Sequence, residues 1–124
     1  IHFVGWQKDL IEFYREADLF LLTSDKEGWP RVIVEAAHFG LPIICTDTGS
    51  AREFVKDGEN GMIIPVADVD ALVAALTYLI PNQQERAKLA VAAARAAQAL
   101  PSEEETIQAY LASFTRALSV YRSL

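Results

Sequence analysis

Two glutamates, Glu27 and Glu35, flank a short polar loop and the first turn of the helical pattern that follows it. Glu35 lies among the apolar residues of segment 32–37, and a carboxylate in such a setting needs hydrogen-bond donors, because leaving it unpaired is costly. Sugar hydroxyls could supply those donors. Two other interpretations stay open: Glu35 lies on the surface, or it forms an ion pair with Arg31 or Arg52.

The start of the predicted helix adds an anion-binding feature beside these carboxylates. Pro30 suits the first position of a helix, where free N–H groups and the positive end of the helix dipole attract phosphate. Because proline has no N–H, the expected donors are the amides of Trp29, Arg31 and Val32. The pattern therefore predicts a phosphate site next to two carboxylates.

Short apolar runs alternate with helical periodicity along the chain, which is typical of an α/β fold. The predicted strands are Ile1–Val4, Leu19–Thr23, Pro42–Thr46 and Met62–Ile64. The runs are apolar on both faces, which indicates a parallel sheet of the Rossmann-like, doubly wound type. In such sheets ligands bind beyond the carboxyl ends of the strands, where the loops Ser24–Trp29 and Asp47–Ser50 are expected.

Helices are predicted from apolar spacing and from capping residues. Gly40 suits the left-handed residue that follows a helix, and Ser50 with Glu53, like Ser102 with Glu105, has capping-box spacing. The sheet is expected to be followed by a C-terminal helical tail. The last helix is expected to bury one face, formed by Ile107, Tyr110, Leu111, Phe114, Leu118 and Tyr121.

Composition excludes several classes of protein. The chain has 124 residues, enough for one domain, and 52% of them are hydrophobic, which excludes a disordered tail. A net charge of −6 without a Lys/Arg cluster argues against a nucleic-acid partner. Cys45 is expected in the core, and His2 and His38 are too scattered to form a metal site. No apolar run reaches the ~18 residues of a membrane helix, and we expect a cytoplasmic protein.

A longer pattern surrounds the two glutamates. It runs from Ala17 to Ala37, continues as Gly40-Leu41-Pro42-Ile43-Ile44 and Thr46-Asp47-x-Gly49, and ends with Asp57-Gly58-x-Asn60-Gly61 and Pro65. The pattern resembles the signature of retaining nucleotide-sugar glycosyltransferases with the two-domain GT-B architecture, in their glycogen synthase-like and sucrose synthase-like group. In order and spacing, the resemblance covers about Ile1 to Leu79.

The resemblance implies a role for each residue of the motif. Glu27 stands where the family has a glutamate against the transferred sugar, close to the reacting carbon, and is the expected catalytic residue. Glu35 stands where a second glutamate binds the ribose hydroxyls of the donor. The backbone contacts to sugar and phosphates are expected from Gly28, Trp29, Arg31 and Val32.

The resemblance also implies what lies outside this chain. Residues 1–124 would be the C-terminal part of the donor-binding domain, without the acceptor domain, and the family's basic pair that grips the diphosphate would lie upstream. The enzyme would transfer a sugar, with retention, from a UDP- or GDP-sugar to a glycan, lipid or small-molecule acceptor. Such enzymes need no metal ion and no other cofactor. The chain alone is expected to be inactive.

The start of the chain supports the expectation of a longer protein. It begins without Met, and four strands are few for a doubly wound sheet, so we expect a sheet truncated at its N-terminus. By resemblance, two earlier strands separate Ile1–Val4 from Leu19–Thr23, and without them an apolar edge is unpaired. We expect either a homodimer through that edge or direct pairing of Ile1–Val4 with Leu19–Thr23.

Two alternative functions stay open at this point. The first is a non-catalytic Rossmann-like interaction module, in which Glu27 and Glu35 have only structural roles. The second is a nucleotide-sugar epimerase of the same fold. The motif also departs from the family at Gly49-Ser50, where two glycines are often found.

Overall fold

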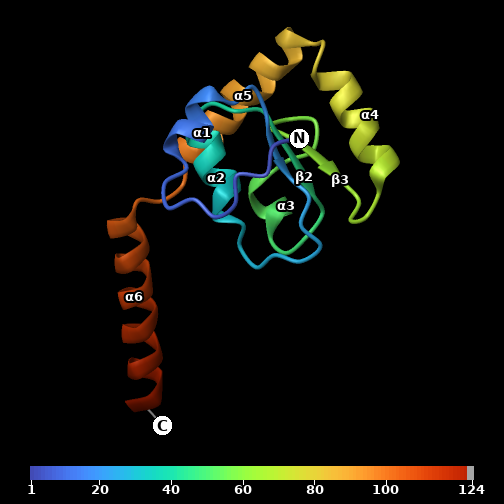
Figure 1. Ribbon diagram of the computed structural model, residues 1–124. Coiled ribbons are helices and arrows are strands. Elements are labelled where there is room, and N and C mark those ends of the chain that lie inside the picture. The colour runs from blue at the N-terminus through green and yellow to red at the C-terminus, as the bar shows by residue number, and fades with distance from the viewer. Residues whose placement is uncertain (123–124) are drawn as a thin grey trace.

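The computed structural model describes residues 1–122 of the chain (Figure 1). Its helices are α1 (Ile11–Glu16), α2 (Arg31–His38), α3 (Ala51–Phe54), α4 (Val69–Leu79), α5 (Gln83–Gln98) and α6 (Glu103–Arg122). Its strands are β1 (Phe20–Leu22), β2 (Ile43–Thr46) and β3 (Met62–Ile64). Helices and strands alternate up to α4, and two more helices follow, as the sequence predicts.

The three strands form one parallel sheet in the order β1-β2-β3. Phe20 lies opposite Ile43 in the first pair of strands, and Ile44 lies opposite Met62 in the second. Parallel neighbours must be joined by a crossover connection, which contains α2 between β1 and β2, and α3 between β2 and β3. The predicted α/β class with a parallel sheet is therefore confirmed.

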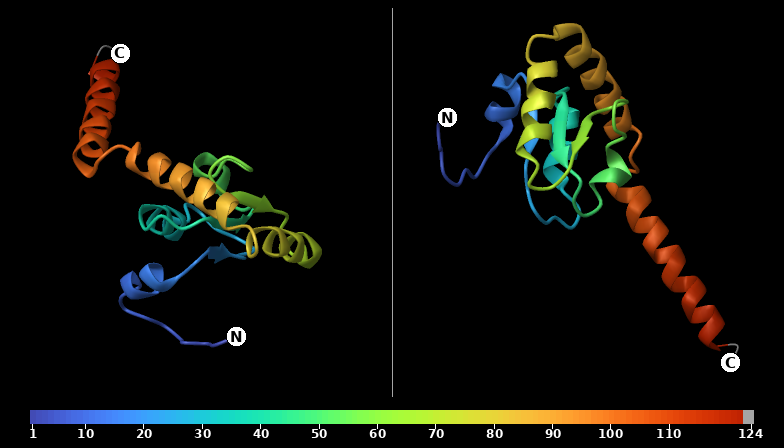
Figure 2. Two further views of the ribbon diagram at one scale, coloured as in Figure 1. Left: turned by 90° about the horizontal axis from the view of Figure 1, so that it is seen from above. Right: turned by 90° about the vertical axis from the view of Figure 1, so that its right-hand side faces the viewer.

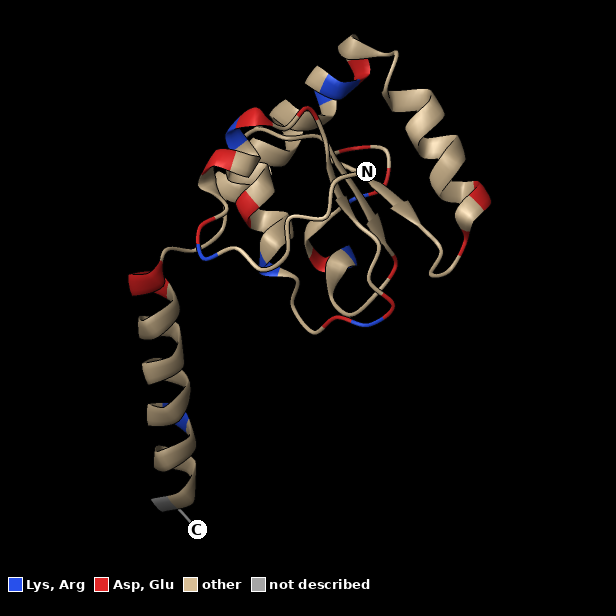
Figure 3. Cartoon of the chain, viewed as in Figure 1, with Lys and Arg blue, Asp and Glu red and all other residues tan. Residues whose placement is uncertain are grey.

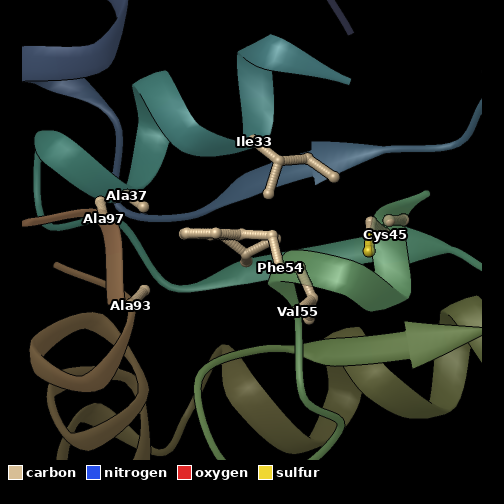
Figure 4. Packing of buried hydrophobic residues seen from close by; sticks show 9 residues of the cluster. Ile33, Ala37, Cys45, Phe54, Val55, Ala93 and Ala97 are labelled. Carbon is tan, nitrogen blue, oxygen red and sulfur yellow. The ribbon is translucent and has the colours of Figure 1, made fainter. Parts of the chain in front are cut away.

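Side chains of β2 alternate between two apolar clusters that lie on opposite faces of the sheet. Ile43 and Cys45 pack in the first cluster with Phe54 of α3 and with alanines of α2 and α5 (Figure 4). Ile44 packs in the second cluster with Leu79 of α4. All four residues of β2 are buried, so this strand has the two covered faces that its sequence predicts.

The first part of the sheet differs from the prediction. Ile1–Val4 is exposed and, within the described residues, pairs with no strand. Its backbone groups therefore form no hydrogen bonds of a sheet. The predicted strand at this position and its direct pairing with Leu19–Thr23 are therefore wrong. β1 is shorter than predicted and forms an edge of the sheet, and Leu21 is 38% exposed because the strand has a neighbour on one side only.

Helix α6 extends away from the rest of the molecule (Figures 1 and 2). Its first turn holds three glutamates, and the remainder carries few charges (Figure 3). The prediction that its apolar face is buried is wrong for the described residues, because the six residues of that face are between 45% and 77% exposed. Amphipathic spacing predicts a helix with an apolar stripe but does not say which surface covers it. Across residues 1–122, no helix has both the length and the apolar character needed to cross a membrane.

Two predicted helix ends are confirmed. Gly40 follows α2 with a φ of 70°, the left-handed conformation that glycine adopts without strain. At the start of α6, the amide of Ser102 donates to the carboxylate of Glu105 at 2.8 Å, and the amide of Glu105 donates to the Ser102 hydroxyl at 3.2 Å. The hydrogen bonds that Ser102 donates, from its amide above all, lower the pKa of Glu105.

Candidate functional site

The loops that follow β1 and β2 are joined by hydrogen bonds at the carboxyl end of the sheet. The buried hydroxyl of Thr46, the last residue of β2, donates to the carbonyl of Ser24 at 2.7 Å. Further along, the amide and the hydroxyl of Ser50 both donate to the carbonyl of Gly28, at 3.0 and 2.8 Å. The segment between β1 and α2 is thereby fixed at both ends, at one end by the last residue of β2 and at the other by the segment that follows β2.

Gly49 allows the two loops to approach each other closely. Its φ of 54° lies in the left-handed region, which favours glycine. A Cβ atom at this position would overlap the carbonyl oxygens of Glu27 and Gly28. The glycine is therefore needed both for its own backbone conformation and for the position of the loop that carries Glu27.

Ser50 does not have the capping role that its spacing predicts. It makes no side-chain capping hydrogen bond to α3, and its hydroxyl is used instead on the carbonyl of Gly28. The predicted capping box with Glu53 is therefore wrong. The physical reason is that the hydroxyl could bond either within its own helix or to the neighbouring loop. It bonds to the loop, and α3 is a helix of only four residues.

The backbone at the start of α2 leaves several N–H groups available. Pro30 precedes the helix, and the amide of Arg31 donates to the carbonyl of Trp29 at 2.9 Å. Within the described part of the chain, the amides of Gly28, Trp29 and Val32 have no hydrogen-bond partner. These three amides are free to bind a ligand in this conformation, whereas the amide of Arg31 is occupied.

Glu27 lies in the same loop, and its side chain is half-buried. Its backbone contacts Gly49, and none of the described side chains or amides donates a hydrogen bond to its carboxylate. A carboxylate without a protein partner, next to free amides, is available to hydroxyl groups of a ligand.

Glu35 lies in the second turn of α2 and is half-buried. Its Oε2 atom accepts a hydrogen bond of 3.0 Å from the hydroxyl of Tyr14. Neither of the alternative ion pairs occurs. Arg52 instead donates two hydrogen bonds to Asp47, at 2.7 and 2.8 Å, and Arg31 forms no ion pair with any described residue.

Tyr14 is the residue of this site that the sequence analysis missed. It is 7% exposed and stacks on Phe39 with ring centroids 5.3 Å apart, while Phe20 lies tilted at 6.1 Å. Leu10, Ile11, Tyr14 and Ala17 have the spacing of a one-sided helix, which predicts only a core position for Tyr14. The signal that could have found it is its polar tip, because a buried tyrosine hydroxyl and a half-buried Glu35 both need a partner.

The titratable groups near β2 are held in one protonation state. A hydrogen bond from Arg52 lowers the pKa of Asp47, and the same contact raises the pKa of Arg52. Burial raises the pKa of the Cys45 thiol to about 11, so this thiol is neutral and belongs to the core, as predicted. Neither Asp47 nor Cys45 is therefore suited to proton transfer near neutral pH.

A hollow of about 380 Å³ borders Glu35 and Tyr14. Segment 8–11 forms one side of it, and His38 and Phe39 form another. A mixed apolar and polar wall next to a carboxylate suits a ring that carries hydroxyl groups. Over the described residues, no group of three or more His, Cys, Asp or Glu side chains is arranged to hold a metal ion.

Comparisons with known proteins place these features in a family. The sequence profile described as Glycosyl transferases group 1 matches residues 1–96. The lipopolysaccharide core biosynthesis glycosyltransferase LpsE of Rhizobium meliloti is 30% identical over 90 residues, which cover 73% of this chain and 26% of that protein. The D-inositol 3-phosphate glycosyltransferase of Mycolicibacterium smegmatis is 32% identical over 117 residues, with 94% and 26% covered. The chain spans about a quarter of the length of these relatives.

Solved structures have the same arrangement of helices and strands. Anabaena HepE in complex with UDP and glucose superposes with a TM-score of 0.78 at 27% identity, covering 94% of this chain and 32% of HepE. Sucrose-phosphate synthase from Thermosynechococcus elongatus superposes with a TM-score of 0.76 at 25% identity, with 90% and 28% covered. The fold is that of the C-terminal domains of GT-B glycosyltransferases.

Proposed function

The chain belongs to the glycosyl transferases group 1 family, and from this premise we propose that it is part of a retaining glycosyltransferase. Residues 1–124 are proposed to form the C-terminal part of the nucleotide-sugar binding domain, and the acceptor domain is proposed to lie outside them. Because the chain spans about a quarter of its relatives, the transfer reaction is proposed for the whole enzyme and not for this chain alone.

The proposed donor is a UDP- or GDP-sugar. The complex of HepE with UDP and glucose supports UDP as the first nucleotide to test. The Glu27–Glu35 motif and the likeness to sucrose-phosphate synthase support a place in the glycogen synthase-like and sucrose synthase-like group. The acceptor is proposed to be a glycan, lipid or small molecule bound by the other domain.

The two carboxylates are proposed to bind different parts of the donor. Glu35 would accept hydrogen bonds from the ribose hydroxyls through the oxygen that Tyr14 leaves free. Glu27, whose carboxylate has no partner among the described side chains and amides, would lie beside the transferred sugar near the reacting carbon. This assignment gives each carboxylate the hydroxyl donors that its position requires.

The backbone at the start of α2 is proposed to bind the diphosphate. The free amides of Gly28, Trp29 and Val32 would donate to the sugar and the phosphates, with the positive end of the helix dipole behind them. The amide of Arg31 would join them only if it leaves the carbonyl of Trp29.

The proposed reaction exchanges one bond at the anomeric carbon for another. The bond from that carbon to a diphosphate oxygen breaks, and its electron pair leaves with the diphosphate. A bond to an acceptor hydroxyl oxygen forms on the same face of the sugar, which gives retention, and the hydroxyl proton passes to the departing diphosphate. Negative charge grows on the departing diphosphate, and oriented amides stabilise it as they would an oxyanion. We propose that no metal ion and no further cofactor take part.

One observation carries this proposal: a loop fixed by Gly49 and Ser50, together with the start of α2, presents three free amides between Glu27 and Glu35. The interaction-module and epimerase alternatives have no comparable observation in their favour. The module alternative leaves the free amides and the unpartnered Glu27 without a role. The matched family and the named relatives are glycosyltransferases.

An NMR titration of the isotope-labelled chain with UDP, GDP and ADP tests the proposal. We expect resonance shifts centred on Gly28–Glu35 for one of the nucleotides, at millimolar affinity because the chain holds only part of the site. Glu35→Ala should abolish these shifts. Glu59→Ala, which removes an exposed carboxylate between α3 and β3, should leave them unchanged.

Two outcomes would contradict the proposal. The first is the absence of shifts with all three nucleotides while Glu35→Ala lowers the free energy of unfolding, which is the behaviour of an interaction module. The second is an equal loss of binding in Glu35→Ala and Glu59→Ala, which would mean that the nucleotide responds to general negative charge and not to this site.

A further inference from the structure

The hydrogen bond between Tyr14 and Glu35 joins two helices that are far apart in the sequence. Tyr14 lies on α1 and Glu35 on α2, and the phenol oxygen is 3.0 Å from Oε2. Among the described residues, Tyr14 is the one hydrogen-bond donor to this carboxylate. The orientation of Glu35 therefore depends on Tyr14.

The phenol that makes this contact is itself held in place. Tyr14 is buried in a small apolar cluster with Ala36 and Leu41, and its ring stacks on Phe39 with an interplanar angle of 23°. Burial raises the pKa of Tyr14 to about 12, and the hydrogen bond and charge of Glu35 raise it as well. The hydroxyl therefore remains a protonated donor at neutral pH.

A carboxylate that binds a diol must present its oxygens in a fixed direction. A free glutamate side chain rotates about three bonds and loses that freedom when a ligand binds. A donor fixed to Oε2 removes part of this cost in advance and leaves Oε1 without a partner among the described residues, and both Tyr14 and Glu35 line the hollow. The contact is thus a means of preorganisation as well as a stabilising hydrogen bond.

We propose that Tyr14 is a positioning residue for nucleotide recognition: it fixes the Glu35 carboxylate so that the free oxygen accepts the ribose hydroxyls. This inference rests on the proposed function, because it takes Glu35 as the ribose-binding group. Tyr14 itself does not touch the ribose in this arrangement. Its effect on binding is exerted through Glu35 and is confined to ligands that carry the hydroxyls.

The test compares UDP with its 2′,3′-dideoxy analogue on the full 124-residue chain. Affinities of both ligands are measured by NMR titration for the wild type, Tyr14→Phe, Glu35→Gln and the control Tyr78→Phe, which alters an exposed tyrosine of α4. We expect the wild type to prefer UDP. Tyr14→Phe should weaken UDP binding about fivefold, the effect of one net hydrogen bond, and leave the analogue unchanged. Tyr78→Phe should change neither affinity.

A merely structural role of Tyr14 has a different signature, because lost packing would weaken UDP and its analogue by the same factor. That result would overturn the inference. Glu35→Asp provides a second variant. It keeps the Tyr14 phenol, and its shorter side chain moves the carboxylate away from that phenol. We expect it to lose the preference for UDP as Tyr14→Phe does.

Failure of the inference and failure of the proposed function are distinguishable in the same data. If Glu35→Gln removes the preference for UDP and Tyr14→Phe keeps it, Glu35 binds ribose without help from Tyr14, and only the inference is overturned. If the wild type binds UDP and the analogue equally well, Glu35 does not bind the ribose, and the proposed role of Glu35 fails together with the inference.

Discussion

Ser50 holds Gly28 through two hydrogen bonds to one carbonyl oxygen, from its amide at 3.0 Å and from its hydroxyl at 2.8 Å. The two residues come from loops that follow different strands, so the contact fixes one loop relative to the other. Because Gly28 follows Glu27 and precedes the free amide of Trp29, this contact sets the position of the groups proposed to bind the donor.

Replacement of Ser50 by alanine tests the hydroxyl half of this contact. We expect Ser50→Ala to lower the free energy of unfolding by about 1 kcal/mol, because one hydrogen bond is lost and the backbone hydrogen bond remains. Hydrogen–deuterium exchange should become faster at the amides of residue 50 and Arg31, which donate to the carbonyls of Gly28 and Trp29. Ser113→Ala, at an exposed position of α6, is the control and should change neither quantity. Unchanged exchange in Ser50→Ala would mean that the amide alone fixes the loop.

Gly49 and Gly40 form a matched pair for separating a steric effect from a conformational one. Both have positive φ, but a Cβ atom at Gly40 meets nothing within 4 Å, whereas at Gly49 it overlaps the backbone of Glu27 and Gly28. Gly40→Ala should therefore cost about 1 kcal/mol for its left-handed conformation alone. Gly49→Ala should cost roughly 3 kcal/mol because the loop must also move.

Urea unfolding of the two glycine variants provides the measurement. The difference between the free energies of unfolding of the two variants, and not either free energy alone, reports the close approach of the two loops. Gly49→Ala should also abolish the nucleotide-induced shifts at Gly28–Glu35, and Gly40→Ala should preserve them. Equal losses of stability in the two variants would contradict the loop contact.

The elements that the sequence predicted well either end for a local reason or are covered by other parts of this chain. Strand β2 is apolar at its first three positions and is covered on both faces, and Gly40 ends α2 for a purely local reason. The segment Ile1–Val4 and the apolar face of α6 have equally clear patterns, yet neither is buried. Their burial depends on a partner surface, and a local pattern contains no information about that surface.

The same distinction applies to the candidate site. The polar loop, Glu27 and the start of α2 could be predicted because they follow from the order of strand, loop and helix along the chain. The contact of Tyr14 with Glu35 spans 21 residues and depends on how α1 packs against α2, so spacing within either helix could not predict it. For the same reason Ser50 was expected to cap its own helix and binds Gly28 instead.

The thiol of Cys45 predicts a loss of stability at alkaline pH. Its pKa is raised from 9.0 to about 11 in the folded protein, chiefly by burial. Between these values the unfolded chain has lost the thiol proton and the folded protein retains it, so the free energy of unfolding falls as pH rises. The limiting slope is about 1.4 kcal/mol per pH unit.

Cys45→Ala is the variant that isolates this contribution. The free energy of unfolding of this variant is expected to be lower at every pH because the side chain is smaller. The slope of the free energy of unfolding against pH is therefore compared between variant and wild type, and not its absolute value. Urea unfolding should show a shallower decline above pH 9.0 in the variant than in the wild type. Identical slopes would mean that the thiol ionises equally easily in the folded and unfolded states. Tyr14, whose pKa is about 12, adds a decline of the same sign at higher pH.

The free edge of β1 predicts self-association of the chain. β1 is paired with β2 on one side only, and an apolar groove of about 510 Å³ adjoins it, lined by residues of α1 and β1. Unpaired backbone groups beside exposed apolar side chains favour pairing with a second strand. A second copy related by a two-fold axis would bring the two β1 strands together antiparallel, which is the expected homodimer.

Sedimentation velocity at increasing concentration measures this association, and Leu21→Lys places a charge at the edge and should keep the chain monomeric. The exposed apolar face of α6 is a competing surface, so Phe114→Lys, which places the same charge there, is the matched control. Loss of the dimer in Phe114→Lys but not in Leu21→Lys would assign the contact to α6. A wild-type chain that stays monomeric at every concentration would contradict association through either surface, and the open edge of β1 would then be protected by its short length of three residues alone.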